Sequence, residues 1–185
     1  MDLVTELEAF DGKHTEVLER LAALVPHRAS AIRELSSIAE SDEAKFQTAA
    51  TWLLKRFHED GVSFTQLQAL GILNLLGRVT HWEAQLHLLQ MLPGLAIPVD
   101  RTALVHRHLC GLLTSPNKFV RAWSYNGLSV LSVQHPEFQN EVAELLAKGQ
   151  REEAASVRAR IRNILKSKEW RKHTEPRAAA DGGGM

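Results

Sequence analysis

The segment VHRHLC, residues 105–110, holds the residue types that most readily bind a transition metal. His106 and Cys110 are four residues apart, so in a helix they lie on one face, while His108 points away from both. A zinc site needs three or four ligands, and this segment supplies two. We therefore expect no metal site here, and we expect no other cofactor.

Patterns for other catalytic chemistry are missing from the sequence. His81, Glu83 and His87 do not have the HExxH spacing of a zinc protease. Cys110 lies in the apolar run LCGLL, where a small buried hydrophobe is expected rather than a nucleophile. The sequence has neither a G-x-S-x-G segment nor a glycine-rich phosphate loop between a strand and a helix. We therefore expect that the protein is not an enzyme.

The segment KFVRAWSYNGLSVLS, residues 118–132, gathers basic, aromatic and amide side chains. Arg121 and Tyr125 are four residues apart and are expected to form an outward-facing pair, with Asn126 beside them. Gly127 costs about 1 kcal/mol relative to alanine inside a helix, which suggests a face where another helix packs closely. Two interpretations follow. The segment is one tier of a packing unit, or Arg121, Tyr125 and Asn126 contact a ligand or a protein.

A second basic segment, SVRARIRNILKSKEWRK, covers residues 156–172. Arg158, Arg162 and Lys166 recur every four residues and form a stripe, with Trp170 one turn further along. One interpretation is a solvated outer face of the last helix; the other is a dock for an acidic protein or a phosphate backbone. Trp170 either anchors the helix or is exposed beside this basic patch.

The charges of the chain balance overall but not locally. The 22 basic and 22 acidic residues give a formal net charge of zero, which argues against a dedicated binder of nucleic acid or of an anionic membrane. Residues 1–60 carry 12 acids and 7 bases, whereas residues 148–177 carry 10 bases and 4 acids. One end of the chain is therefore acidic and the other basic.

The remaining composition indicates the compartment. A single cysteine excludes an intrachain disulfide and favours a reducing environment. The first residues, MDLVTELEAF, lack the basic and apolar regions of a secretory signal, and no apolar stretch reaches 18 residues. We expect a cytoplasmic protein without a membrane partner.

Apolar residues recur with helical period in segment after segment, which predicts an all-α chain. The expected helices are 14–25, 28–39, 43–58, 64–77, 81–92, 99–113, 117–133, 137–148 and 153–168, with a short one near 2–10. Connections of two to six residues predict antiparallel neighbours. Gly61 and Gly149 are expected to end helices with positive φ. The glycine-rich segment 174–185 is expected to be disordered.

The helical blocks recur at steps of 36 to 38 residues. Val120-Arg121-Ala122 is followed by Leu128, and 37 residues later Val157-Arg158-Ala159 is followed by Leu165. This V-R-x-x-x-x-x-x-L pattern resembles the first helix of HEAT-type (armadillo-like) repeats. The resemblance covers about residues 40–168. The block at 81–92 departs from it, because Glu83 stands near the position where arginine is expected.

This resemblance implies one domain over residues 1–173, a right-handed α-solenoid of three to four antiparallel helix pairs. Residues 1–40 would form an atypical cap, and residues 41–168 the repeats. The second helix of each pair would line a concave side. Its polar residues would be the first contacts for a partner: Gln68, Arg101, His108, Glu141 and Glu144.

The function expected from these observations is a non-enzymatic scaffold that binds another protein. The alternative is nucleic-acid binding, including kinship with the HEAT-like DNA glycosylases that excise alkylated bases. The protein partner is favoured because the net charge is zero and no glycosylase motif is present.

Overall fold

The computed structural model describes residues 2–25 and 29–174, and within these ranges the protein is all-α, without a strand. The helices are α1 (Leu3–Glu8), α2 (Glu16–Leu24), α3 (Ala29–Ile38), α4 (Ala44–Glu59), α5 (Gln66–Leu75), α6 (Trp82–Met91), α7 (Thr102–Leu112), α8 (Lys118–Gln134), α9 (Gln139–Glu152), α10 (Ala155–Lys166) and α11 (Lys168–Thr174). Short 3-10 turns are η1 (Leu92–Gly94), η2 (Val99–Arg101) and η3 (Pro136–Phe138). The all-α prediction is confirmed. The segment expected to be disordered lies outside the described residues, apart from Thr174.

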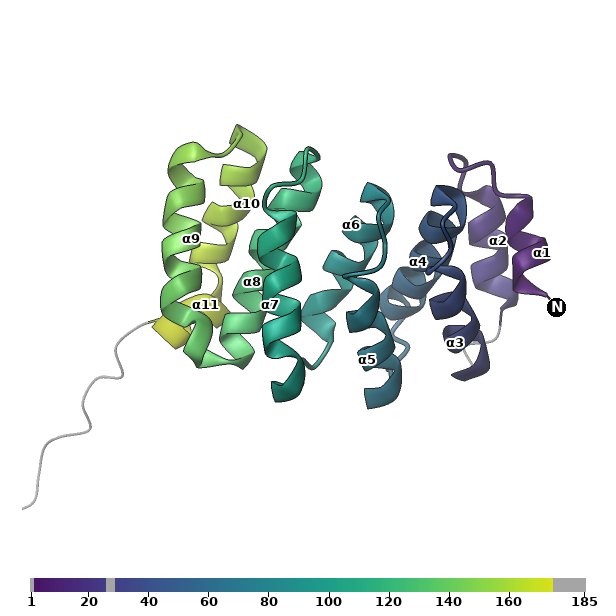
Figure 1. The fold of residues 1–185 in the computed structure, drawn as a ribbon, viewed down its shortest axis with the longest axis horizontal. Coiled ribbons are helices and arrows are strands. Elements are labelled where there is room, and N and C mark those ends of the chain that lie inside the picture. The colour runs from purple at the N-terminus through teal and green to yellow at the C-terminus, as the bar shows by residue number, and fades with distance from the viewer. Residues whose placement is uncertain (1, 26–28, 175–185) are drawn as a thin grey trace, which may run out of the picture.

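The helices form two layers that run along the long axis of the molecule (Figure 1). In one layer α2, α4, α6, α8 and α10 pack each on the next, and α11 closes the end against α8 and α10. In the other layer α1 packs on α3 and α3 on α5, while α7 and α9 both pack on α8. The amino terminus and α9–α11 therefore lie at opposite ends of the molecule (Figure 1).

The core lies between these layers and runs the length of the described chain. Each long helix buries residues three or four apart, as in Leu53, Leu54 and Phe57 of α4 or Leu128 and Leu131 of α8, all of them fully buried. Each full burial of a leucine or phenylalanine side chain contributes about 1.5–3 kcal/mol. Because the buried residues of one helix contact the next, the core is shared along the stack.

A buried glutamine of α4 defines where α6 begins. The N-cap residue of α6, His81, makes no side-chain capping bond. Instead Gln47, only 3% exposed, accepts hydrogen bonds at Oε1 from the backbone amides of Thr80 and His81, both at 2.9 Å. Its Nε2 donates to the Ser41 carbonyl at 2.8 Å. One side chain thus satisfies amides that a helix start leaves free, and it links α4 to the start of α6.

The two glycines predicted to end helices behave differently. Gly61 follows α4 with φ 84°, as expected. The prediction for Gly149 is wrong, because Gly149 is buried inside α9, which continues to Glu152. Its neighbour across the interface is Tyr125 of α8, whose ring occupies the space that a side chain would need.

No helix in the described part of the chain is long and apolar enough to cross a membrane.

Candidate functional site

Arg121, the first residue of the predicted contact cluster, is held within the protein. Its Nε donates to both carboxylate oxygens of Glu153, at 3.2 and 3.1 Å, and its guanidinium also donates to the Ser115 carbonyl at 2.8 Å. Both side chains of the ion pair are largely buried, at 20% and 13% exposure. Arg121 therefore joins the turn before α8 to the end of α9.

Tyr125 does not face outward, so that prediction is wrong. Its side chain is 6% exposed and lies over Gly149 of α9. Burial, and secondly the carboxylate of Glu153, raises the pKa of the Tyr125 phenol. The reason is the position of α8, which has α6, α7, α9 and α10 as neighbours and leaves little free surface. Asn126, half-buried, lines a different part of the molecule, the groove described below.

Replacing Gly149 by alanine is expected to destabilise the protein by about 1–2 kcal/mol in urea unfolding. A Cβ at this position would lie 2.7 Å from Tyr125 Oη and 2.7 Å from Ile161 Cδ1. Such overpacking costs about 1–3 kcal/mol, partly offset by the better helix propensity of alanine.

The matched control is Gly71→Ala. Gly71 lies inside α5, and a Cβ there would meet no atom within 4 Å. This substitution is expected to stabilise the protein by about 0.5–1 kcal/mol. Equal effects at the two glycines would contradict the close packing of Tyr125 on α9.

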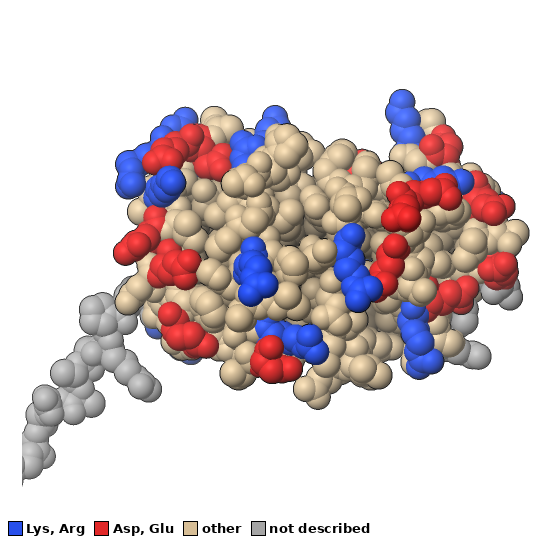
Figure 2. Space-filling model, viewed as in Figure 1, with Lys and Arg blue, Asp and Glu red and all other residues tan. Residues whose placement is uncertain are grey.

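The polar residues predicted on the second helices are separate from one another. Gln68 and Thr65 form a capping box at the start of α5, and the ring of His108 lies against Gly77. The remaining three are Arg101, whose Nε is 3.5 Å from Asp100 Oδ2, Glu141, which pairs with His106, and Glu144, which is exposed on α9. Figure 2 shows this face, where charges of both signs are scattered. Their role in partner binding stays a prediction.

The basic patch at the carboxyl end is exposed only in part. Arg162 and Lys166 face solvent, and neither pairs with a carboxylate of the described residues. Arg158 is half-buried. Trp170 is 5% exposed, so of its two interpretations the structure shows the one in which it anchors the chain end.

A groove of about 510 Å³ runs between α8 and α10, and we call it the C-terminal groove. Its lining includes Asn126, Val130 and Val133 of α8 and Arg160, Asn163 and Ile164 of α10. The guanidinium of Arg160 lies 4.1 Å from the centre of the Trp123 ring, which holds this charge at the groove. The sequence stripe did not indicate Arg160, because it falls between Arg158 and Arg162 on another side of the helix.

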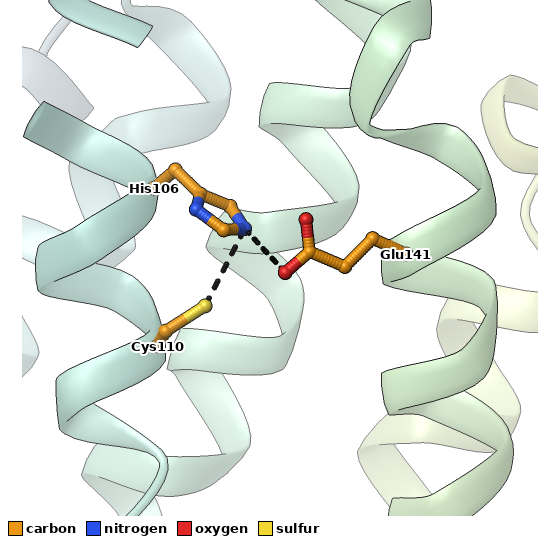
Figure 3. A group of neighbouring side chains, drawn as sticks. All are labelled: His106, Cys110 and Glu141. Carbon is orange, nitrogen blue, oxygen red and sulfur yellow. Dashed lines mark hydrogen bonds and ion pairs between the residues drawn. The ribbon is translucent and has the colours of Figure 1, made fainter. Parts of the chain in front are cut away.

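A third cluster joins α7 to α9 (Figure 3). His106 Nε2 lies 3.5 Å from Cys110 Sγ and 3.2 Å from Glu141 Oε1, and the three atoms lie within 4.8 Å of one another. The Phe138 ring packs against His106 at 4.9 Å between centroids. The expectation of no metal site rested on two ligands in one segment, whereas the fold brings a third from 31 residues beyond Cys110.

This cluster does not have the geometry of a Cys–His–carboxylate relay. A relay uses the two ring nitrogens separately, one toward the nucleophile and one toward the carboxylate. Here Cys110 and Glu141 both approach Nε2. Burial and the nearby Glu141 carboxylate also raise the pKa of the Cys110 thiol, which is the opposite of what activates a nucleophile.

Comparison of the chain with protein-family models, with curated proteins and with solved structures gives no match.

Proposed function

We propose that the chain is a HEAT-like helical repeat module that binds an acidic segment of a partner protein in the C-terminal groove. The observation that carries this proposal is the groove itself: apolar walls beside a chain end that is strongly basic.

Regular spacing of the helices supports the repeat interpretation. The helices α4, α6, α8 and α10 begin at residues 44, 82, 118 and 155, at intervals of 38, 36 and 37. The helices α3, α5, α7 and α9 begin at residues 29, 66, 102 and 139, at intervals of 37, 36 and 37. Two helices every 37 residues, stacked in two layers, are typical of an α-solenoid, in which each pair completes its core against the next.

The chemistry of the groove favours an acidic segment that also carries apolar side chains. Val130, Val133 and Ile164 offer apolar contact, and Arg160 and Asn163 offer hydrogen-bond donors. Residues 155–174 hold one acidic residue, Glu169, and seven basic ones: Arg158, Arg160, Arg162, Lys166, Lys168, Arg171 and Lys172. This charge would steer an acidic partner toward the groove.

A nucleic acid fits the groove less well than a protein segment does. A phosphate backbone is bound by a row of cations along an extended surface, and bases require donors and acceptors or stacking faces. The groove has aliphatic walls, and Glu169 also lines it. The ring of Trp123 is occupied by Arg160. Duplex DNA is therefore the comparison ligand in the test.

Selection of short random peptides on the immobilised protein tests the proposal. We expect enrichment of sequences that combine Asp or Glu with large apolar residues. Binding of a selected peptide, followed by fluorescence anisotropy, is expected to weaken at least about tenfold in the double variant Arg162→Glu/Lys166→Glu, because two rim charges are reversed. Raising the salt concentration should also weaken it.

The matched control is Arg20→Glu/Arg33→Glu, which reverses two exposed charges near the other end of the molecule and is expected to leave binding unchanged. Three results would overturn the proposal: no enrichment of acidic peptides, equal loss of binding in both double variants, or salt-sensitive binding of duplex DNA in preference to the peptides.

A further inference from the structure

The cluster of His106, Cys110 and Glu141 has a feature that hydrogen bonding leaves unexplained: two groups converge on one nitrogen. The imidazole Nε2 carries either one hydrogen or one lone pair, and it is approached by a thiol and by a carboxylate at the same time. A thiol, an imidazole and a carboxylate whose ligand atoms meet around one point are what a metal ion requires.

The distances agree with a tetrahedral zinc ion. Zinc–ligand bonds of about 2.0–2.1 Å to nitrogen, about 2.0–2.2 Å to oxygen and about 2.3 Å to sulfur, at tetrahedral angles, place nitrogen and oxygen about 3.4 Å apart and nitrogen and sulfur about 3.6 Å apart. The corresponding separations here are 3.2 and 3.5 Å. A small adjustment of the exposed Glu141 side chain therefore admits the ion.

The surroundings provide both rigidity and access. His106 and Cys110 are one turn apart on α7, so their spacing is fixed by the helix, and Phe138 restricts the imidazole plane. An opening of about 550 Å³ between α7, α8 and α9 includes Cys110 in its lining, and the Glu141 side chain is 55% exposed. An ion and a water molecule as fourth ligand can reach the cluster from this side.

We propose that His106, Cys110 and Glu141 form a Zn²⁺ site with one open coordination position. Thiolate and imidazole ligands select zinc over magnesium or calcium, and the carboxylate completes three protein ligands. The ion would link α7 directly to α9, two helices that each pack on α8. Because the folded chain alone brings Glu141 to α7, bound zinc would stabilise the folded state.

Titration of the chelator-treated full chain with Co²⁺ tests the proposal. We expect one equivalent of Co²⁺ to give the visible absorption of a tetrahedral site and the near-ultraviolet charge-transfer band of a thiolate ligand. Zn²⁺ is expected to displace it and to raise the thermal unfolding midpoint. Cys110→Ser is expected to remove the charge-transfer band. Glu141→Gln is expected to weaken binding at least tenfold, since loss of even a supporting group lowers metal affinity by about 10–100-fold.

Glu144→Gln is the matched control, because Glu144 is exposed one turn further along α9 and is expected to leave affinity unchanged. Circular dichroism verifies that the variants fold. Absence of the thiolate band in the wild-type chain would overturn the proposal without reference to any variant. Equal affinity of the wild type, Cys110→Ser and Glu141→Gln would overturn it as well, because it would indicate adventitious binding by other histidines.

Discussion

Replacing Gln47 by leucine lowers the free energy of unfolding by about 2–4 kcal/mol, because it leaves buried or half-buried polar groups without partners. The amides of Thr80 and His81 lose their acceptor, and the carbonyl of Ser41 loses its donor. Leucine keeps the volume of the side chain approximately, so the effect is mainly that of lost hydrogen bonds. Urea unfolding followed by circular dichroism measures it.

Two further substitutions separate this effect from a general loss of polarity. Gln47→Glu keeps an acceptor at the start of α6, where the helix dipole favours negative charge, and is expected to cost less than leucine. Gln66→Leu changes an exposed glutamine in the first turn of α5 and is expected to have an effect within about 0.5 kcal/mol. A cost for Gln47→Leu as small as that for Gln66→Leu would contradict the role of Gln47.

Acidification from pH 6.5 to pH 4 removes about 3 kcal/mol of stability through His87 alone. This residue lies on α6, where its Nδ1 is 3.1 Å from Thr51 Oγ1 of α4. Burial, followed by the charge of Lys55 and by His81, lowers the pKa of His87 from 6.5 to about 4. Below pH 6.5 the unfolded chain binds a proton that the folded chain does not. Stability is therefore lost as the pH falls through this window.

The measurement is the free energy of unfolding between pH 4 and pH 7 in the wild type and in His87→Gln. The variant is expected to lack the part of the acid loss that His87 contributes. His14→Gln provides a control of opposite sign, because a hydrogen bond and the charge of Asp11 raise the pKa of the exposed His14. That pair stabilises the fold at low pH and loses its effect as the pH rises. Parallel pH profiles of the wild type and His87→Gln would contradict the burial of His87.

The helices could be predicted from the sequence because burial imposes a period on it. Most long helices begin or end within two or three residues of their expected positions, and Gly61 ends α4 as its conformational freedom allows. Tyr125 and Gly149 could not be placed, because α8 has neighbours on nearly every side. On such a helix, residues four apart share a face, but the sequence does not say which helix that face meets.

The candidate sites depend on contacts between segments far apart in the chain. Glu141 reaches His106 only because α7 and α9 pack side by side on α8, and no local spacing encodes that contact. Gln47 likewise reads as one polar residue within an apolar helix until the start of α6 is placed beside it. The C-terminal groove arises from the packing of α10 on α8, and its Arg160 is positioned by Trp123 of the other helix.

Hydrogen exchange of the chain, with and without an acidic peptide selected on it, locates the binding surface most directly. Binding in the C-terminal groove is expected to slow exchange of the amides in α8 and α10, with little change in α5 and α7. Protection confined to α5, α7 and α9, where the resemblance to HEAT repeats places the concave surface, would contradict the proposed site.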